Sequence, residues 1–415
     1  MSPSQIRRTA FILIVALATT LSAQTKPRAR DLGVPFDGTP GSNNAITDVK
    51  GVEVGHTTLI SGEGKLEIGK GPVRTGVTAI HPRGKASNDA VFAAWFTLNG
   101  NGEMTGTTWV DDSGFLNGPV MITNTHSVGV VRDAVIAWKV KHGSPDMEGY
   151  WWSLPVVAET WDGYLNDING FHVKAEHAMA ALDAAAGGPV EEGNVGGGTG
   201  MICHEFKCGI GTASRIVTVA KTRYTVGALV QANYGVRDTL RIAGVPVGKE
   251  LREHRVYAEE ASERGDTGSI IIVLATDAPL LPHQLKRLAR RAALGLARNG
   301  SYAGNGSGDL FVAFSTANPA ALQDAALNTA SFVGNDWIDP LFLGTVEATE
   351  EAIVNALVAA RDMKGQDGHY ALAIPHEGLR AVLKRYQRLL EPCPARGARG
   401  VSPTTGRPCL EPARE

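Results

Sequence analysis

The sequence predicts an α+β layered sandwich built as a single domain. Some segments are rich in β-branched residues and alternate as strands do, and others have helical periodicity. The two kinds are interleaved along the chain but do not follow a regular strand–helix–strand order. The 415 residues, of which 43% are hydrophobic, suffice for one large core. Neither a fixed-period repeat nor a low-complexity linker divides the chain into two domains.

The first residues have the form of a secretory signal peptide spanning 1–23. Arg7 and Arg8 precede an apolar stretch over 10–21, and small residues end at Ala23. We therefore expect export to a periplasmic or secreted location, by the twin-arginine or the general route, with an uncleaved anchor helix as the alternative. The Pro- and Gly-rich segment that follows, 24–45, is predicted to be a linker.

Strands are predicted first, then a helix, and then strands and helices in turn. The predicted strands are 52–60, 75–82, 90–98, 118–131, 209–220, 223–235, 269–274 and 310–316. The predicted helices are 171–188, 279–300, 347–363 and 376–390. The charged segment 249–268 is expected to be a solvated loop or a frayed helix.

The helix at 279–300 carries the clearest pattern in the chain. Pro282 stands where a helix begins, and Asn299-Gly300 stands where one ends. Its predicted apolar face consists of Leu285, Leu288, Ala292 and Leu296. We expect that face to pack on the core and its arginines to face solvent.

The four cysteines favour two local disulfides, Cys203 with Cys208 and Cys393 with Cys409. A zinc site at "CHEFKC" is the weaker alternative, because the spacing is not a CxxC pair and no partner pair exists. The histidines form no metal-binding cluster, so we predict neither a metal nor a cofactor. The Pro- and Arg-rich tail from about 391 is predicted to be disordered.

Composition and motifs also exclude several function classes. A formal net charge of −2 gives no reason to expect nucleic acid, or a membrane once the signal is removed, as a partner. The sequence has no GxSxG nucleophile elbow and no SxxK. "GGGTG" lacks the Gly-Lys-Ser/Thr of a phosphate-binding loop.

The seam in "GDTGSIIIVL" is open to two interpretations. Ser269 is either the polar first residue of a buried strand or a residue exposed by cleavage after Gly268. A free α-amine on Ser269, with a pKa near ~7.7–8.0, would act as a base beside its own hydroxyl. A preceding glycine tolerates the strain of attack on its carbonyl. These residues alone leave both interpretations open.

Longer motifs favour the second interpretation. "EGNVGGGTGM", "GIGTASR", "YTVGALVQANYG", "GSIIIVLATDAPLLPHQLKRLARRAALGLARNG" and "GNGSGDLFVAFSTAN" resemble the DmpA-like family of self-processing aminopeptidases. The resemblance runs from about Arg30 to about Arg385. It implies a four-layer α/β/β/α sandwich of the N-terminal-nucleophile type. It also implies self-cleavage into an α-chain, 24–268, and a β-chain, 269–415, of one catalytic domain.

The resemblance assigns catalytic roles to four residues. It makes Ser269 the nucleophile and Asn233 the residue that stabilises the oxyanion. Ser307 and Asp309 in "GSGD" match a serine and a carboxylate that hydrogen-bond the nucleophile and hold its proton. Some β-aminopeptidases carry Glu where this chain has the shorter Asp309.

Two further residues concern the substrate. Glu159 matches a glutamate that meets the substrate's ammonium group, with a surface salt bridge as the alternative role. Trp161 stands where L-aminopeptidase/D-esterase relatives carry a catalytic tyrosine, so any role of that hydroxyl is lost or moved. Both residues are predicted to shape the substrate pocket.

The implied activity is a serine aminopeptidase acting on short peptides, amides or esters through an acyl-enzyme. Substrates with an N-terminal β-amino acid compete with α-amino substrates of either chirality. The alternatives are an acyltransferase like the ornithine acetyltransferases, which use threonine, or an inactive secreted binding protein on this fold. The resemblance also implies an oligomer of αβ pairs, with a tetramer favoured.

Overall fold

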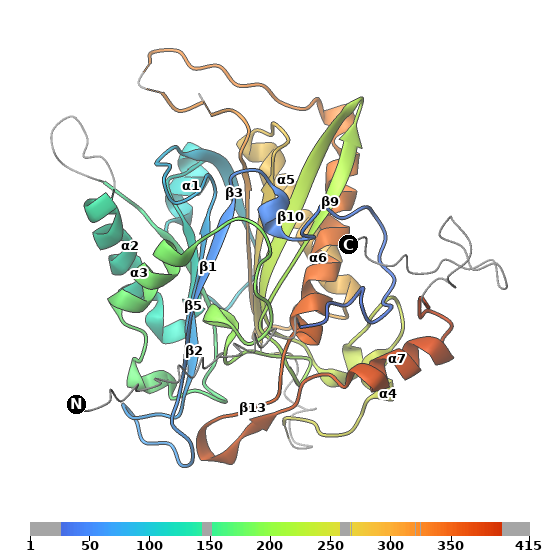
Figure 1. Ribbon diagram of the computed structural model, residues 1–415. Helices are drawn as coiled ribbons and strands as arrows, with labels where there is room; N and C mark the ends of the chain where they lie inside the picture. The colour runs from blue at the N-terminus through green and yellow to red at the C-terminus, as the bar shows by residue number, and fades with distance from the viewer. Residues whose placement is uncertain are drawn as a thin grey trace, which may run out of the picture.

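The computed structural model describes residues 26–142, 152–257, 266, 268–319, 321–323 and 325–391. The signal peptide and most of the tail after residue 391 lie outside the described residues, as do Cys393 and Cys409. Figure 1 shows two sheets side by side, with α2 and α3 outside one of them and α5 and α6 outside the other.

The larger sheet has six strands in the order β4-β3-β12-β11-β10-β9. Their bounds are β3 Val91–Gly100, β4 Phe115–Leu116, β9 Ile210–Val219, β10 Thr222–Asn233, β11 Ser269–Thr276 and β12 Gly308–Ser315. The strand β11 pairs antiparallel with β10 and parallel with β12.

The smaller sheet has four strands in the order β1-β2-β5-β6. Their bounds are β1 Glu53–Ser61, β2 Val73–His81, β5 Val120–Asn124 and β6 Val156–Thr160. Two short hairpins complete the strands, namely β7 Ile202–Cys203 with β8 Phe206–Lys207, and β13 Met363–Lys364 with β14 Tyr370–Ala371.

The helices form the two outer layers. Their bounds are α1 Thr107–Ser113, α2 Val128–His142, α3 Ala175–Ala184, α4 Val247–Glu250, α5 Pro282–Arg298, α6 Asp339–Val358 and α7 His376–Arg385. One apolar cluster joins α2 and α3 to the smaller sheet, and another joins α5 and α6 to the larger sheet. A third cluster lies between the sheets, so the predicted α/β/β/α layering is confirmed.

The strand β11 is continuously apolar because it is buried on both faces. Ile270, Ile272 and Leu274 join the cluster under the helices, whereas Ile271 and Val273 join the cluster between the sheets. Alternate residues of a strand point to opposite faces, so a strand buried on both faces needs apolar residues at every position.

Two of the predicted elements are wrong. The strand predicted over 118–131 ends at Asn124, and α2 begins at Val128, because three of its buried residues recur at helical rather than alternating spacing, namely Val128, Val131 and Val135. The segment predicted as a linker, 24–45, is packed in its described part: Ala29 and Val34 are fully buried.

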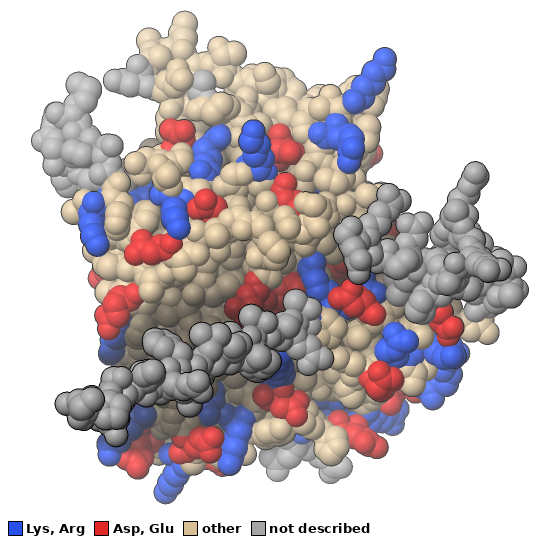
Figure 2. Space-filling view, viewed as in Figure 1, with Lys and Arg blue, Asp and Glu red and all other residues tan. Residues whose placement is uncertain are grey.

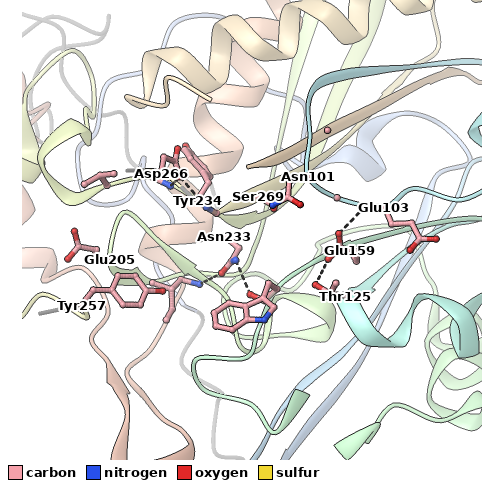
Figure 3. A pocket seen from close by; sticks show the side chains of 17 residues that line it. Asn101, Glu103, Thr125, Glu159, Glu205, Asn233, Tyr234, Tyr257, Asp266 and Ser269 are labelled. Carbon is pink, nitrogen blue, oxygen red and sulfur yellow. Dashed lines mark hydrogen bonds between the residues drawn. The ribbon is translucent and has the colours of Figure 1, made fainter. Parts of the chain in front are cut away.

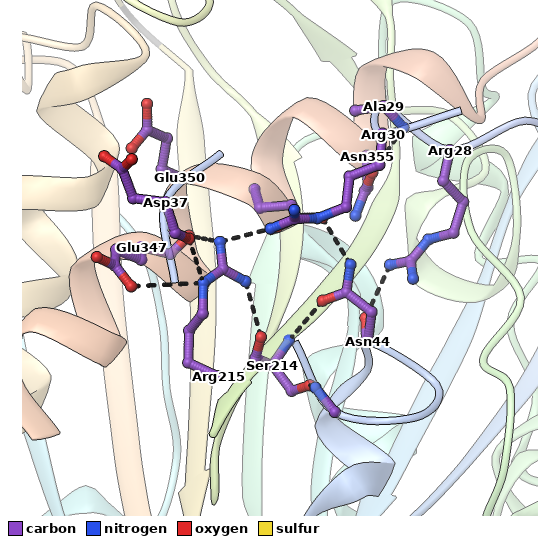
Figure 4. A network of polar contacts seen from close by, with 12 residues as sticks. Arg28, Ala29, Arg30, Asp37, Asn44, Ser214, Arg215, Glu347, Glu350 and Asn355 are labelled. Atoms are coloured by element: carbon purple, nitrogen blue, oxygen red, sulfur yellow. Dashed lines mark hydrogen bonds and ion pairs between the residues drawn. The ribbon is translucent and has the colours of Figure 1, made fainter. Parts of the chain in front are cut away.

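The packed N-terminal segment is fixed by a buried ion network shown in Figure 4. Glu351 on α6 accepts hydrogen bonds from Arg30 at 2.8 Å and from Asn44 at 2.6 Å, and it pairs with Arg215 of β9 at 2.8 Å. Arg28 binds Glu192 in the same region. The arginines of the segment that was predicted to be a linker are therefore paired with carboxylates of the folded protein.

Figure 2 shows basic and acidic side chains interspersed over one face. In the described ranges, none of the helices combines the length and apolar character needed to cross a membrane.

Candidate active site

Strand pairing brings the four predicted catalytic residues together. Ser269 is the first residue of β11, and the antiparallel ladder places Asn233, the last residue of β10, directly opposite it. The parallel ladder places Gly308, between Ser307 and Asp309, on its other side. Residues far apart in the sequence thus meet where the inner strands of the larger sheet begin or end.

Ser307 and Asp309 form a buried hydrogen-bonded pair. The Ser307 hydroxyl donates to Asp309 Oδ2 at 2.8 Å and accepts from Asn99 Nδ2 at 3.0 Å. The Ser269 hydroxyl accepts the Gly308 N–H at 3.0 Å. Among the described residues, neither Ser307 nor Asp309 hydrogen-bonds Ser269 in the uncut chain, so the predicted direct contact is not formed before cleavage.

The environment of Asp309 favours its protonated form. Burial raises the pKa of Asp309 to about 6, although the Ser307 hydroxyl opposes the rise. The charge of Asp266 raises it further, and among the described residues no hydrogen-bond partner meets the buried Asp309 Oδ1. The pair can therefore exchange a proton within the pH range in which peptidases work.

Asn233 is held rigidly by hydrogen bonds on both ends of its amide. Its Nδ2 donates to the Trp161 carbonyl at 2.9 Å, and its Oδ1 accepts the Ile202 N–H at 2.8 Å. The amide nitrogen has a second N–H to offer a substrate oxygen. Asn233 is the last residue of β10, so the strand ladder fixes its backbone as well.

Glu159 lies at the end of β6 and is only 4% exposed. It accepts a hydrogen bond from the Thr125 hydroxyl and, at 3.0 Å, from the Glu103 N–H. Burial is the largest cause that raises the pKa of Glu159 above its ordinary value. These contacts exclude the alternative of a surface salt bridge.

Trp161 lies on the same wall but is 48% exposed. Its indole carries no hydroxyl, so it shapes the pocket and holds Asn233 through its carbonyl. Two tyrosines that the sequence analysis did not single out, Tyr234 and Tyr257, also line the pocket. The hydroxyl of Tyr234 is buried and has no hydrogen-bond partner within the part of the chain that the structure describes.

Ser269, Asn233, Glu159 and Trp161 line a cavity of about 830 Å³, whereas Ser307 and Asp309 lie behind its wall. Figure 3 places Ser269 and Asn233 between Glu159 on one side and Glu205 and Asp266 on the other. Glu103 is a fourth carboxylate on the wall, and the described lining includes neither lysine nor arginine. A cavity of this charge favours a cationic ligand.

Sequence reasoning missed several lining residues. Besides Tyr234, they include Asn101, Glu103, Thr125, Glu205, Tyr257 and Asp266. No local pattern marks five of these, because loops between distant elements carry them to the site. Asp266 alone had a signal, since it lies in the turn "GDTG" ahead of Ser269.

Gly268 is required by its packing. A Cβ atom at this position would lie 2.2 Å from the Asn233 carbonyl oxygen and 2.5 Å from Tyr234 Cα. Real Cβ contacts are never that short, so a side chain would push the Gly268–Ser269 bond away from β10. The glycine thus keeps this bond against the strand that carries Asn233.

Cys203 and Cys208 are free thiols, and the predicted disulfide between them is not formed. Both are buried on the hairpin that supports Asn233 through Ile202. A hydrogen bond between the thiols and burial raise the pKa of Cys203, burial being the larger cause. Within the described ranges, no three His, Cys, Asp or Glu side chains form a metal-binding group.

A sequence model of Peptidase family S58 matches residues 44–371. This chain belongs to Peptidase family S58. Beta-peptidyl aminopeptidase BapA from Sphingosinicella microcystinivorans is 58% identical over 391 residues, which cover 92% of this chain and 97% of that protein. The BapA of Sphingosinicella xenopeptidilytica is 52% identical over 389 residues, covering 90% and 94%.

Solved structures agree with this S58 assignment. The L-aminopeptidase D-Ala-esterase/amidase of Ochrobactrum anthropi, a variant of the Ntn hydrolase fold, has a TM-score of 0.81 and 51% identity. The match covers 88% of this chain and 100% of the Ochrobactrum anthropi chain. A Burkholderia sp. beta-aminopeptidase has a TM-score of 0.78 and 50% identity, covering 86% and 99%. The predicted family and fold are confirmed.

Proposed function

We propose that this S58 peptidase cuts itself between Gly268 and Ser269 and then releases N-terminal β-amino acids from short peptides and amides. The observation that carries this proposal is the position of Ser269 at the start of β11. There it faces Asn233 and the Gly308 N–H, in a cavity whose wall holds the buried carboxylate of Glu159.

Self-cleavage follows from the position of the Ser269 hydroxyl next to the carbonyl of Gly268. The Ser269 hydroxyl attacks the Gly268 carbonyl, the C–N bond breaks, and the hydroxyl proton passes to the released α-amine. Water then hydrolyses the resulting ester, which leaves a Gly268 carboxylate and a Ser269 with a free hydroxyl and a free amine. Asn233 lies beside this carbonyl and can stabilise the negative charge on its oxygen.

Substrate hydrolysis repeats this chemistry on another carbonyl. The α-amine of Ser269 takes the hydroxyl proton as the hydroxyl attacks the substrate, and it returns a proton to the leaving amine. Ser307 and Asp309 lie one strand away and orient the groups that carry the proton. The Asn233 amide stabilises the oxyanion by roughly 3–4 kcal/mol. Water resolves the acyl-enzyme.

Recognition of the substrate amine is assigned to Glu159. A buried carboxylate that accepts hydrogen bonds from Thr125 and Glu103 is fixed in place and meets an ammonium group through a charge-assisted bond. Relatives named as beta-peptidyl aminopeptidases, 58% and 52% identical, support β-amino acids over α-amino acids in this site.

Export and assembly complete the proposal. The signal-like segment 1–23 supports a periplasmic or secreted location. Exposed apolar side chains on and beside one loop support an oligomer of αβ pairs, with a tetramer favoured: Leu327 is 92% exposed, and Phe332 and Trp337 are exposed with it.

The decisive experiment compares the wild-type protein with Ser269→Ala on a denaturing gel and in an aminopeptidase assay. We expect two bands and activity for the wild type, and one uncut band without activity for the variant. Two normal bands from Ser269→Ala would disprove the mechanism. Parallel assays with β-alanyl, L-alanyl and D-alanyl anilides identify the preferred substrate.

A further inference from the structure

Beyond its charge, which raises the pKa of Asp309, Asp266 has no role in the chemistry above, yet it binds the residue that precedes the bond to be cut. It lies three residues before Ser269 and is buried in the cavity wall. Its Oδ1 accepts two backbone hydrogen bonds, from the Gly268 N–H at 3.3 Å and from the Gly235 N–H at 2.9 Å. Gly268 carries the carbonyl to be attacked, and Gly235 follows the end of β10.

Asp266 also contacts the loop that leads to Ser307. Its backbone N–H donates to the Tyr302 hydroxyl at 2.9 Å. Gly304 packs so closely on it that a Cβ atom there would lie 2.3 Å from the Asp266 carbonyl oxygen. The Gly304 carbonyl in turn accepts the Ser307 N–H at 2.9 Å. Asp266 therefore connects the residue before the cut to the segments that carry Asn233 and Ser307.

We propose that Asp266 is a positioning residue for self-cleavage, which holds the Gly268 peptide in the orientation that Ser269 attacks. The inference rests on the proposed function. It assigns no proton transfer to Asp266. The carboxylate fixes the amide on one side of Gly268, while the carbonyl on its other side receives the hydroxyl.

The physical need for such a residue comes from Gly268 itself. Packing against Asn233 and Tyr234 excludes a side chain there, and a glycine without one samples many backbone conformations. Attack on a carbonyl requires the reacting atoms to be aligned, and a misplacement of about 1 Å can slow a reaction about 100-fold. One carboxylate oxygen that binds both Gly268 and the rigid end of β10 restricts that freedom.

The test measures the rate of self-cleavage of the full chain, synthesised in vitro and sampled over time on denaturing gels. Asp266→Ala removes both accepted hydrogen bonds, and we expect cleavage at least about tenfold slower. Asp266→Asn keeps an oxygen at Oδ1 without the charge, so we expect a rate within about threefold of the wild type. This rescue separates positioning from a role as base.

Asp277→Ala is the matched control. Asp277 follows the opposite end of β11, and its Oδ1 accepts the Thr225 N–H of β10 at 2.7 Å. It makes the same kind of bond away from the cavity, so this variant should cleave at the wild-type rate. Urea unfolding of each variant shows whether a slow rate reflects loss of the fold.

Tyr302→Phe keeps the proposal testable if Asp266→Ala does not fold. Tyr302 is exposed, and its substitution removes only the acceptor of the Asp266 N–H. We expect cleavage about threefold slower. The proposal is overturned if folded Asp266→Ala cleaves at the wild-type rate, if Asp266→Asn is as slow as Asp266→Ala, or if Tyr302→Phe has no effect. An uncut wild type would instead disprove the proposed function.

Discussion

At the scale of single residues, the site depends on carboxylates with different surroundings. Glu159 is buried and accepts two hydrogen bonds, which prepares it to bind a cation. Asp309 is buried beside the charge of Asp266, which prepares it to hold a proton near neutral pH. In the proposed function, the carboxylate of Glu159 therefore serves recognition and that of Asp309 serves proton handling.

For Glu159→Gln, we expect kcat/KM to fall about 10- to 100-fold for substrates with a free amine, because a charge-assisted hydrogen bond is lost. The amide keeps the shape of the side chain, so cleavage into two chains should continue. An N-acetylated ester, which has no ammonium group, is the control substrate and should lose little. An unchanged rate on amine substrates would remove Glu159 from the site.

The pH profile reports on Asp309. Burial raises its pKa to about 6, so the carboxylate that accepts from Ser307 is present above that pH and is lost below it. Protonation of the Ser269 α-amine, with a pKa near ~7.7–8.0, already lowers the rate in acid. We expect kcat/KM for an N-acetylated ester to fall more steeply once the pH drops below about 6. Asp309→Asn should lower the rate and leave only the limb set by the amine. A wild-type profile that does not steepen near pH 6 would contradict the assignment.

At the scale of the elements, the N-terminal segment is as much a part of the fold as the strands. Glu351 on α6 lies between Arg30 of that segment and Arg215 of β9. Burial alone would raise the pKa of Glu351, but the bond to Arg30 and the charge of Arg215 hold it below its ordinary value. The network thus ties three elements through one carboxylate.

Glu351→Gln should lower the free energy of unfolding by about 3 kcal/mol, because it takes the nearest carboxylate from the buried Arg215 and the only carboxylate that the described residues offer to the half-buried Arg30. Glu350→Gln is the matched control: its partner Arg298 is on the surface, and we expect a loss of at most about 1 kcal/mol. Urea titrations at neutral pH measure both. Equal losses would show that the buried network adds nothing specific.

The lowered pKa of Glu351 also sets a pH dependence. A carboxylate with a folded-state pKa below its unfolded value stabilises the fold above the unfolded pKa. That contribution decreases as the pH falls through the lowered pKa. The difference in unfolding free energy between wild type and Glu351→Gln should therefore shrink in acid.

At the scale of the whole molecule, the two chains that the proposed cleavage after Gly268 would make are interwoven. In the larger sheet, β3 and β10 precede the cut, whereas β11 and β12 follow it and lie between them. Each chain therefore lacks the central neighbours of its own strands. Neither can keep a complete core alone.

We therefore expect the cut protein to remain one species in its native state. Size-exclusion chromatography of the wild type and of Ser269→Ala should give the same apparent mass, although only the wild type gives two bands when denatured. The same measurement reports the number of αβ pairs in the oligomer. Separation of the two chains without denaturant would contradict the interwoven arrangement.

The sequence by itself determined the elements with strong local patterns. The α5 helix follows its predicted apolar face, since all four residues of that face are buried, and β11 follows from its run of β-branched residues. Long family motifs also predicted roles for Ser269, Asn233, Ser307, Asp309 and Glu159. Such features depend on residues close in the chain or on motifs that relatives share.

Only the tertiary structure decided what depends on distant residues. It placed Glu103, Thr125 and Asp266 in the cavity, and it packed the N-terminal segment that its composition marked as a linker. It also left Cys203 and Cys208 as free thiols. The physical reason is that burial, pairing of charges and approach of loops arise when strands far apart in the sequence become neighbours in one sheet.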